Sequence, residues 1–283
     1  MLSYRHAFHA GNHADILKHV VLCATLQYAL RKEAPLFFLD THAGAGLYSL
    51  RSEQALQTGE ASAGILRLDL SALLAASTGE EHSLVDGYAA AVQPWLARHQ
   101  YPGSPLLAAG LLRRQDHLHL CELHPTDVEL LTGHLWGDRR CSVEQADGYQ
   151  RALALLPPVQ KRAVVLIDPS YERKDDYRKV VRLMADLQQR MRAAQLLLWY
   201  PVVERSDIEQ LLGGLQRSGV RDLWQFELGM AADRSGHGLT ASGMLVVNPP
   251  FTLPGALRAL LPRLQEQLAP AYGHWKVRQL VGE

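Results

Sequence analysis

The sequence has few cysteines, no excess of charge of either sign and no apolar run of the roughly 20 residues that a membrane-spanning helix needs. Cys23, Cys121 and Cys141 are far apart and form no CxxC pair, so we expect reduced thiols and a cytoplasmic protein. The first residues contain no apolar segment typical of a signal peptide, which favours the same localisation. Lysine plus arginine equals aspartate plus glutamate, at 29 each, so any nucleic-acid-binding surface must be a local patch.

Apolar segments of strand length alternate with segments of helical periodicity along most of the chain. This alternation predicts an α/β fold in which helices cover both faces of a mostly parallel sheet. The first predicted strand ends at Asp40, and the other six span 117–123, 141–149, 163–167, 195–201, 222–230 and 242–250. The predicted helices span 14–32, 106–114, 125–135, 150–155, 175–193 and 205–218.

One interval is too long for a simple strand–helix–strand unit. Residues 47–116 separate the first two strands, whereas a whole βαβ unit usually needs roughly 30 residues. We therefore expect a helical subdomain, residues 51–100, inserted into a core formed by residues 1–50 and 101–283. Ser104 is then predicted to cap the first core helix beside the glycine loop of the first strand.

Four consecutive predicted strands end in a carboxylate: Asp40, Glu122, Asp147 and Asp168. Ligands of open α/β sheets bind outside the carboxyl ends of the strands, so these acids indicate a site. Glu122 is placed to accept hydrogen bonds from a ribose diol, and Asp147 from an adenine amino group, with Gly148 leaving room for the ring. An acid at Asp40 would repel a pyrophosphate but suits the cationic end of S-adenosylmethionine.

The glycine loop that follows Asp40 is weaker evidence. The sequence AGAG, with Gly44 and Gly46, lacks the full G-x-G-x-x-G pattern, and its glycines could serve only a tight turn.

The fourth strand ends in Asp168, Pro169, Ser170 and Tyr171. An adenine amino group is a poor nucleophile because its lone pair is delocalised, and acceptors that hold its two N–H groups favour the pyramidal, reactive form. The Asp168 carboxylate and the Pro169 carbonyl are such acceptors, and Tyr171 offers a face on which a flipped-out base stacks.

The segments MLSYRHAFHAGNHADILKH, LDTHAGAG, YPGSPL, ELHP, ADGY, LIDPSYE and LWYPVV together resemble the bacterial 23S rRNA adenine-N6 methyltransferases of the RlmJ type. The resemblance implies a Rossmann-like class I methyltransferase with a helical insertion, and Asp168 as the catalytic acceptor. It also implies that Tyr4 faces the RNA, and that S-adenosylmethionine contacts Lys18, His19, His42, Ser104, Glu122, Asp147, Gly148 and Asp168. We expect His6 of the same N-terminal arm to contact the RNA as well. The sequence departs from the (D/N)PP(Y/F/W) motif at Ser170, which replaces the second proline.

A rival motif, NPPF at 248–251, follows the seventh predicted strand. In a methyltransferase sheet that last strand is antiparallel and forms a hairpin with the sixth, so its carboxyl end points away from the cofactor. We therefore expect Asn248 to Phe251 to form a structural turn.

The histidines at 6, 9, 13 and 19 have loose spacing and are joined by no cysteine, so we expect no metal site. The alternatives left open are a DNA adenine or a protein glutamine as methyl acceptor, or a non-catalytic nucleic-acid-binding protein. We expect no membrane partner and a monomer.

Overall fold

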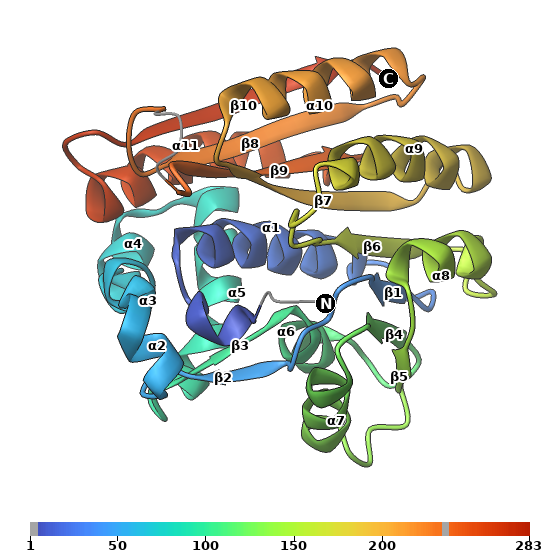
Figure 1. Ribbon diagram of the computed structural model, residues 1–283, viewed down its shortest axis with the longest axis horizontal. Helices are drawn as coiled ribbons and strands as arrows, with labels where there is room; N and C mark the ends of the chain where they lie inside the picture. Colours follow the sequence, from blue (N-terminus) through green and yellow to red (C-terminus); the bar gives the residue numbers. More distant parts are fainter. Residues whose placement is uncertain (1–4, 234–237) are drawn as a thin grey trace.

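The computed structural model describes residues 5–233 and 238–283, and within them a central eight-stranded sheet lies between two layers of helices (Figure 1). The strands are β1 (Phe37–Asp40), β2 (Leu47–Ser49), β3 (Gln100–Pro102), β4 (His117–Glu122), β5 (Cys141–Gln145), β6 (Ala163–Ile167), β7 (Gln195–Val202), β8 (Leu223–Gly229), β9 (Ala241–Val247) and β10 (His274–Val281). The helices are the 3-10 turn η1 (His6–Phe8), α1 (His13–Ala29), α2 (Glu53–Thr58), α3 (Glu60–Ala63), α4 (Leu70–Ala76), α5 (Gly79–Leu96), α6 (Ser104–Leu111), α7 (Pro125–His134), α8 (Gly148–Leu155), α9 (Asp175–Arg190), α10 (Arg205–Arg217) and α11 (Leu253–Leu268).

The sheet confirms the predicted fold class and corrects the number of strands. The strand order is β10-β8-β9-β7-β6-β1-β4-β5, with parallel pairing from β7 to β5. Strand β9 lies between β7 and β8 and is antiparallel to both, which confirms the hairpin expected of the seventh strand. The prediction of seven strands was one too few, because β10 pairs antiparallel with β8 at the edge of the sheet.

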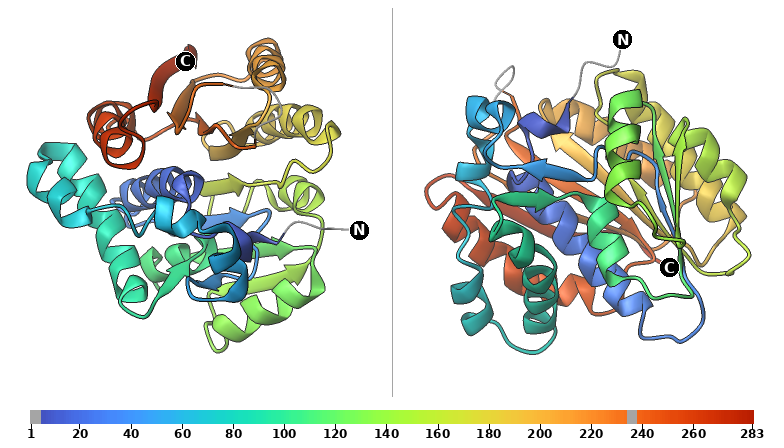
Figure 2. Two further views of the ribbon diagram at one scale, coloured as in Figure 1. Left: turned by 60° about the vertical axis from the view of Figure 1, so that its left-hand side comes forward. Right: turned by 90° about the horizontal axis from the view of Figure 1, so that it is seen from below.

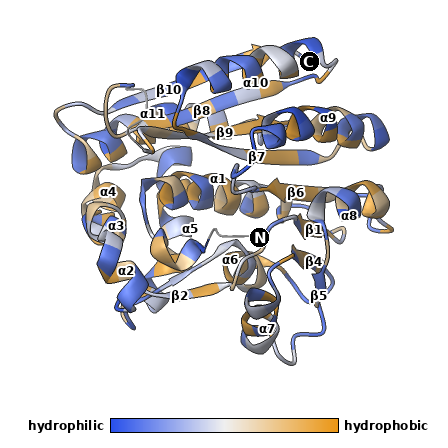
Figure 3. Ribbon diagram, in the orientation of Figure 1, coloured by the Kyte–Doolittle hydropathy of each residue, from blue (hydrophilic) through white to orange (hydrophobic). Residues whose placement is uncertain are grey.

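The central strands of the sheet are buried on both faces, so they are mostly apolar rather than alternating (Figure 3). On one face, α1, α5, α6 and α11 contribute to one apolar cluster. On the other face, α8, α9 and α10 contribute to a second cluster. These two layers hold the strands in place, and the parallel strands present their carboxyl ends at one edge.

The segment between the first strand and α6 forms helices α2 to α5, as its sequence pattern predicts, and α5 packs against α1 (Figure 2). Strands β2 and β3 pair antiparallel, so the chain leaves and re-enters the sheet region at neighbouring points. The Gly103 amide donates to the Gly46 carbonyl over 2.8 Å, which places the start of α6 beside the glycine loop, as expected.

The prediction that Ser104 caps α6 was wrong, because Gly103 is the N-cap and Ser104 is the first helical residue. Its hydroxyl is free of the capping role and donates instead to the carboxylate of Asp40.

In the described part of the chain, no helix is both long enough and apolar enough to cross a membrane.

Candidate active site

A cavity of about 700 Å³ opens at the carboxyl ends of β1, β4, β6 and β7, beneath the N-terminal arm (residues 5–12). Much of the predicted site is in its wall: His6, Lys18, His19, His42, Ser104, Glu122, Asp168, Pro169 and Tyr171. Tyr4 lies outside the described residues. Residues from five separate parts of the sequence therefore share one cavity, which only the sheet topology can bring about.

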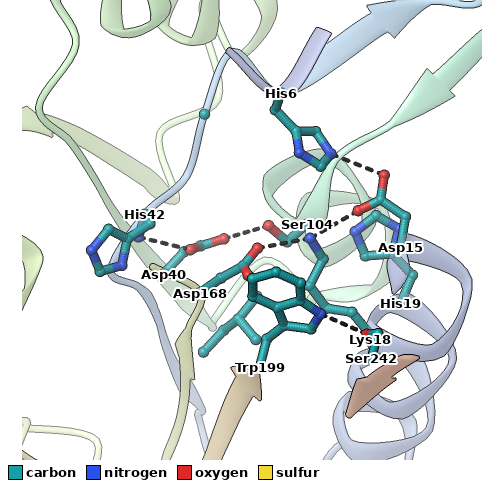
Figure 4. Close-up of polar contacts among 12 residues, drawn as sticks. His6, Asp15, Lys18, His19, Asp40, His42, Ser104, Asp168, Trp199 and Ser242 are labelled. Atoms are coloured by element: carbon teal, nitrogen blue, oxygen red, sulfur yellow. Dashed lines mark hydrogen bonds and ion pairs between the residues drawn. The ribbon is translucent and has the colours of Figure 1, made fainter. Parts of the chain in front are cut away.

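The Asp168 carboxylate follows β6 and forms an ion pair with Lys18 from α1 (Figure 4). The Lys18 Nζ atom is 2.7 Å from Asp168 Oδ2 and 2.9 Å from Asp15 Oδ1, and the lysine side chain is 6% exposed. Burial alone would lower the pKa of Lys18, but the two carboxylates hold it well above its usual value. Lys18 is therefore a fixed cation. Asp168 Oδ1, by contrast, has no hydrogen-bond donor among residues 5–233 and 238–283.

Asp15 is a site residue that the sequence analysis missed. It is buried, and its Oδ2 atom accepts from the Gly11 amide at 2.9 Å and lies 2.9 Å from His6 Nε2. Burial would raise the pKa of Asp15, yet His6 and Lys18 hold it well below its usual value. One ionised carboxylate thus connects the N-terminal arm to the lysine that contacts Asp168. The i, i+3 spacing of Asp15 and Lys18 on a predicted helix is the signal that could have revealed it.

Asp40 lies behind the cavity wall rather than in it. Its carboxylate is 0% exposed and accepts from the Ser104 hydroxyl at 2.6 Å and from the His42 amide at 3.2 Å. Burial raises the pKa of Asp40 to about 7, and the nearby charge of Asp168 adds to the increase, while the hydrogen bond from Ser104 opposes it. Burial also lowers the pKa of His42, so its imidazole is neutral.

Glu122 supports the glycine loop from the end of β4. Its Oε2 atom accepts from the Gly44 amide and its Oε1 atom from the His124 amide, both at 2.8 Å. Gly44 has a φ of 61°, a left-handed conformation that favours glycine, and a Cβ atom there would collide with the hydroxyl of Tyr48. Glu122 is thus held in one orientation at the cavity wall, with two oxygens that retain lone pairs for a further donor.

Asp147 and Gly148 are not part of this cavity. Asp147 caps α8, accepting from the Tyr149 and Gln150 amides with Oδ1, and it borders a separate depression of about 250 Å³. A Cβ atom at Gly148 would collide with the Thr41 carbonyl oxygen, and whether Gly148 also leaves room for the adenine ring stays a prediction. Glycine is required at this position for the close approach of α8 to the loop after β1.

Tyr171 belongs to an aromatic group in the wall of the cavity, together with Tyr177 and Trp199. Its hydroxyl donates to the Trp199 carbonyl at 2.7 Å, and its ring centroid is 4.6 Å from that of Tyr177 and 5.9 Å from that of Trp199. Tyr171 has a φ of 53°, which is unusual for a side chain of this size, and strained residues of this kind cluster at functional sites. The indole of Trp199 is itself fixed, donating to the Ser242 hydroxyl at 2.8 Å.

The rival NPPF motif lies beside the start of β7, at the opposite end of the parallel strands from Asp168. Val247, the last residue of β9, pairs with Leu196 at the start of β7, whereas Ile167, which precedes Asp168, pairs with Leu198 further along that strand. The Asn248 side chain donates to the carbonyls of Arg192 and Ala194 at 2.7 and 2.8 Å. Asn248 therefore holds a turn, as expected.

No group of three or more His, Cys, Asp or Glu side chains in the described ranges has an arrangement that could hold a metal ion.

Comparison with known proteins places this geometry in a family. The family model described as "RsmJ: Ribosomal RNA large subunit methyltransferase D, RlmJ" matches residues 33–281. Proteins named ribosomal RNA large subunit methyltransferase J from Escherichia coli (strain K12) and Haemophilus influenzae are 45% and 41% identical, and each alignment covers 100% of both chains. A solved structure from Legionella pneumophila str. Philadelphia 1 is 32% identical with a TM-score of 0.85, covering 96% of this chain and 98% of that one. The chain belongs to the RlmJ family of ribosomal RNA large subunit methyltransferases.

Proposed function

We propose that this protein uses S-adenosylmethionine to methylate the N6 amino group of an adenine in 23S rRNA. The proposal is supported by family membership and by one observation above all: the Asp168 carboxylate lies in the cavity with one oxygen held by Lys18 and the other without a donor among the described residues. That free oxygen is available to an N–H group of the substrate.

The residues of the cavity suit this cofactor. The volume is within the range of roughly 300–1,000 Å³ typical of cofactor sites. Carboxylates at Glu122 and Asp168 match a ligand that carries a ribose diol and a cationic end. When bound, S-adenosylmethionine would supply the methyl group from its sulfonium centre. We propose that Lys18, His19, His42, Ser104, Glu122 and Asp168 surround it, and that Asp147 accepts from its adenine through the Oδ2 atom that capping leaves free.

The chemistry assigned to the protein is the activation of an amine. Asp168 Oδ1 and the Pro169 carbonyl would each accept one N–H group of the adenine amine, which localises the lone pair on nitrogen for attack on the methyl group. Lys18 keeps the Asp168 carboxylate in place, so little rearrangement is needed during the reaction. Tyr171, whose hydroxyl is tied to Trp199, would present its ring to the extruded base.

The N-terminal arm is proposed to contact the RNA through Tyr4 and His6. Two contacts hold the described part of the arm over the cavity. His6 forms a hydrogen bond with Asp15, and the guanidinium of Arg5 is 3.3 Å from the carboxylate of Asp127. An RNA loop that reaches Asp168 would therefore pass the arm. We further propose a cytoplasmic monomer in which residues 51–100 form a subdomain inserted into a core of residues 1–50 and 101–283.

Mass analysis of nucleosides from the 23S rRNA of a deletion strain tests the activity. We expect the loss of one N6-methyladenine, restored by the wild-type gene and not by one encoding Asp168→Ala. An unchanged nucleoside profile would contradict the proposal and would favour a DNA adenine or a protein glutamine as the acceptor, or a non-catalytic role.

A further inference from the structure

His19 is a buried residue of the cavity wall with one ring nitrogen that lacks a partner. It lies on α1 beside Lys18 and is 1% exposed (Figure 4). Its Nδ1 atom is 3.0 Å from the hydroxyl oxygen of Tyr101, whereas Nε2 has no hydrogen-bond partner among the described residues. Burial lowers the pKa of His19 to about 3, so the ring is neutral and carries one proton. What it can offer a ligand depends on which nitrogen holds that proton.

The hydroxyls of Tyr101 and Tyr88 form a hydrogen-bonded chain that leads from His19 into the core. Tyr101 on β3 is 0% exposed and Tyr88 on α5 is 1% exposed, and their hydroxyl oxygens are 2.9 Å apart. In the described part of the chain neither hydroxyl forms another hydrogen bond. Tyr101 has His19 and Tyr88 as its partners, and Tyr88 has Tyr101 alone.

The count of hydrogens determines the direction of this chain. If Nδ1 carried the proton, it would donate to Tyr101, and one of the two hydroxyl hydrogens would be left in the core without an acceptor. If instead Tyr88 donates to Tyr101 and Tyr101 donates to Nδ1, both hydroxyl hydrogens are used and the imidazole proton is on Nε2. Each arrangement leaves one hydrogen without an acceptor among the described residues, a tyrosine hydroxyl hydrogen in the first and the Nε2 hydrogen in the second. Buried donors without acceptors are rare because they lose their hydrogen bonds to water. Only His19 belongs to the cavity wall, where a bound ligand can supply the missing acceptor, so the second arrangement is favoured.

We propose that Tyr101 is a positioning residue that holds His19 as an Nε2–H donor, and that this donor binds the carboxylate of the amino-acid part of the cofactor. The identity of the ligand group rests on the proposed function. A neutral imidazole with its proton on Nε2 can bond to a carboxylate but not to an ammonium group, so the tautomer selects which end of the amino acid His19 contacts. Tyr88 completes the hydrogen bonding of Tyr101 but is not required for Tyr101 to donate to Nδ1.

Long-range ¹H–¹⁵N spectra of the full-length protein with ¹⁵N-labelled histidine report the tautomer directly. The His19 signals are assigned with the His19→Gln variant. We expect a protonated Nε2 and an unprotonated, hydrogen-bonded Nδ1 in the wild type and in Tyr88→Phe, and mixed tautomers in Tyr101→Phe. A wild-type His19 protonated at Nδ1 overturns the proposal, even where a variant fails to fold.

Titration calorimetry tests the consequence for binding with two probes, S-adenosylhomocysteine and 5′-methylthioadenosine, which lacks the amino acid. Tyr101→Phe should weaken S-adenosylhomocysteine by about fivefold, part of the roughly tenfold or larger effect of losing a hydrogen bond to a charged group, and 5′-methylthioadenosine by less than about twofold. Tyr88→Phe is the matched control, because it also removes one hydroxyl from a buried ring, and it should change neither affinity by more than about twofold.

Equal losses for both probes, or equal effects of the two variants, would show that Tyr101 acts only through packing. If wild-type protein binds neither probe, the proposed function fails, and the spectra still decide the tautomer by themselves.

Discussion

Replacing Asp40 by asparagine should make the protein more stable at high pH while impairing its use of a cationic cofactor. In the folded protein, burial raises the pKa of Asp40 to about 7 from an ordinary value near 3.8. Between those two pH values the folded state binds one more proton than the unfolded state. The contribution of Asp40 to stability therefore falls as the pH rises through this window and levels off above pH 7.

The size of the effect follows from the pKa. Between pH 5 and pH 7, Asp40 lowers the free energy of unfolding by about 1.4 kcal/mol for each pH unit, or roughly 2–3 kcal/mol in all. An asparagine side chain at this position does not titrate and can keep an acceptor for the His42 amide. The stability of Asp40→Asn minus that of the wild type should thus rise by roughly 2–3 kcal/mol between pH 5 and pH 8, because other titrating groups cancel in the difference.

Urea unfolding of both proteins at pH 5 and pH 8 measures that difference, and calorimetry measures the second half of the prediction. Between pH 6 and pH 8 the wild type should gain up to about tenfold in affinity for S-adenosylmethionine as Asp40 ionises, and Asp40→Asn should gain much less. A stability difference that does not change with pH would refute the argument, because Asp40 would then be ionised throughout or its charge would be compensated.

Three further changes test separate parts of the site. Glu122→Ala should weaken S-adenosylmethionine by about 1.5–3 kcal/mol, the range for a lost hydrogen bond to a charged group, and unchanged calorimetric affinity would remove Glu122 from the ribose assignment. Deleting residues 1–8 should spare cofactor binding, because α1 remains, yet abolish methyl transfer, and a truncated enzyme with the full-length rate would leave the arm without a role. Tyr171→Ala should raise the RNA concentration needed for half-maximal rate, as expected for the loss of a stacking partner worth roughly 1–3 kcal/mol, whereas an unchanged value would contradict base stacking.

The centre of the parallel half of the sheet was predictable because β1, β6 and β7 are largely buried and read as short apolar runs. Strand β10 and helix α11 were not predicted. Strand β10 is an edge strand with charged residues such as Lys276 and Arg278, so it lacks that signal. Helix α11 has leucines at helical spacing, Leu253, Leu257 and Leu264 among them, but Pro262 inside it reads as a break.

The acids at the strand ends could be predicted because a parallel sheet brings those ends together. The partners of these acids depend on contacts between distant segments, which no local pattern encodes. His6 reaches Asp15 only because the arm folds back over the cavity, and Tyr101 reaches His19 only because β2 and β3 pair. The packing role of Gly148 could not be predicted, since the sequence does not show that Thr41 occupies the space beside it.

The central claim is that Asp168, and not the NPPF motif, carries the chemistry. Radiolabelled methyl transfer to 23S rRNA by Asp168→Ala and Asn248→Ala, with circular dichroism to verify folding, tests it most directly. Asp168→Ala should remain folded, because Lys18 keeps Asp15 as a partner, and should lose at least about 10²-fold in turnover. Asn248→Ala should keep nearly the full rate apart from any loss of stability, whereas a folded but inactive Asn248→Ala beside an active Asp168→Ala would contradict the account.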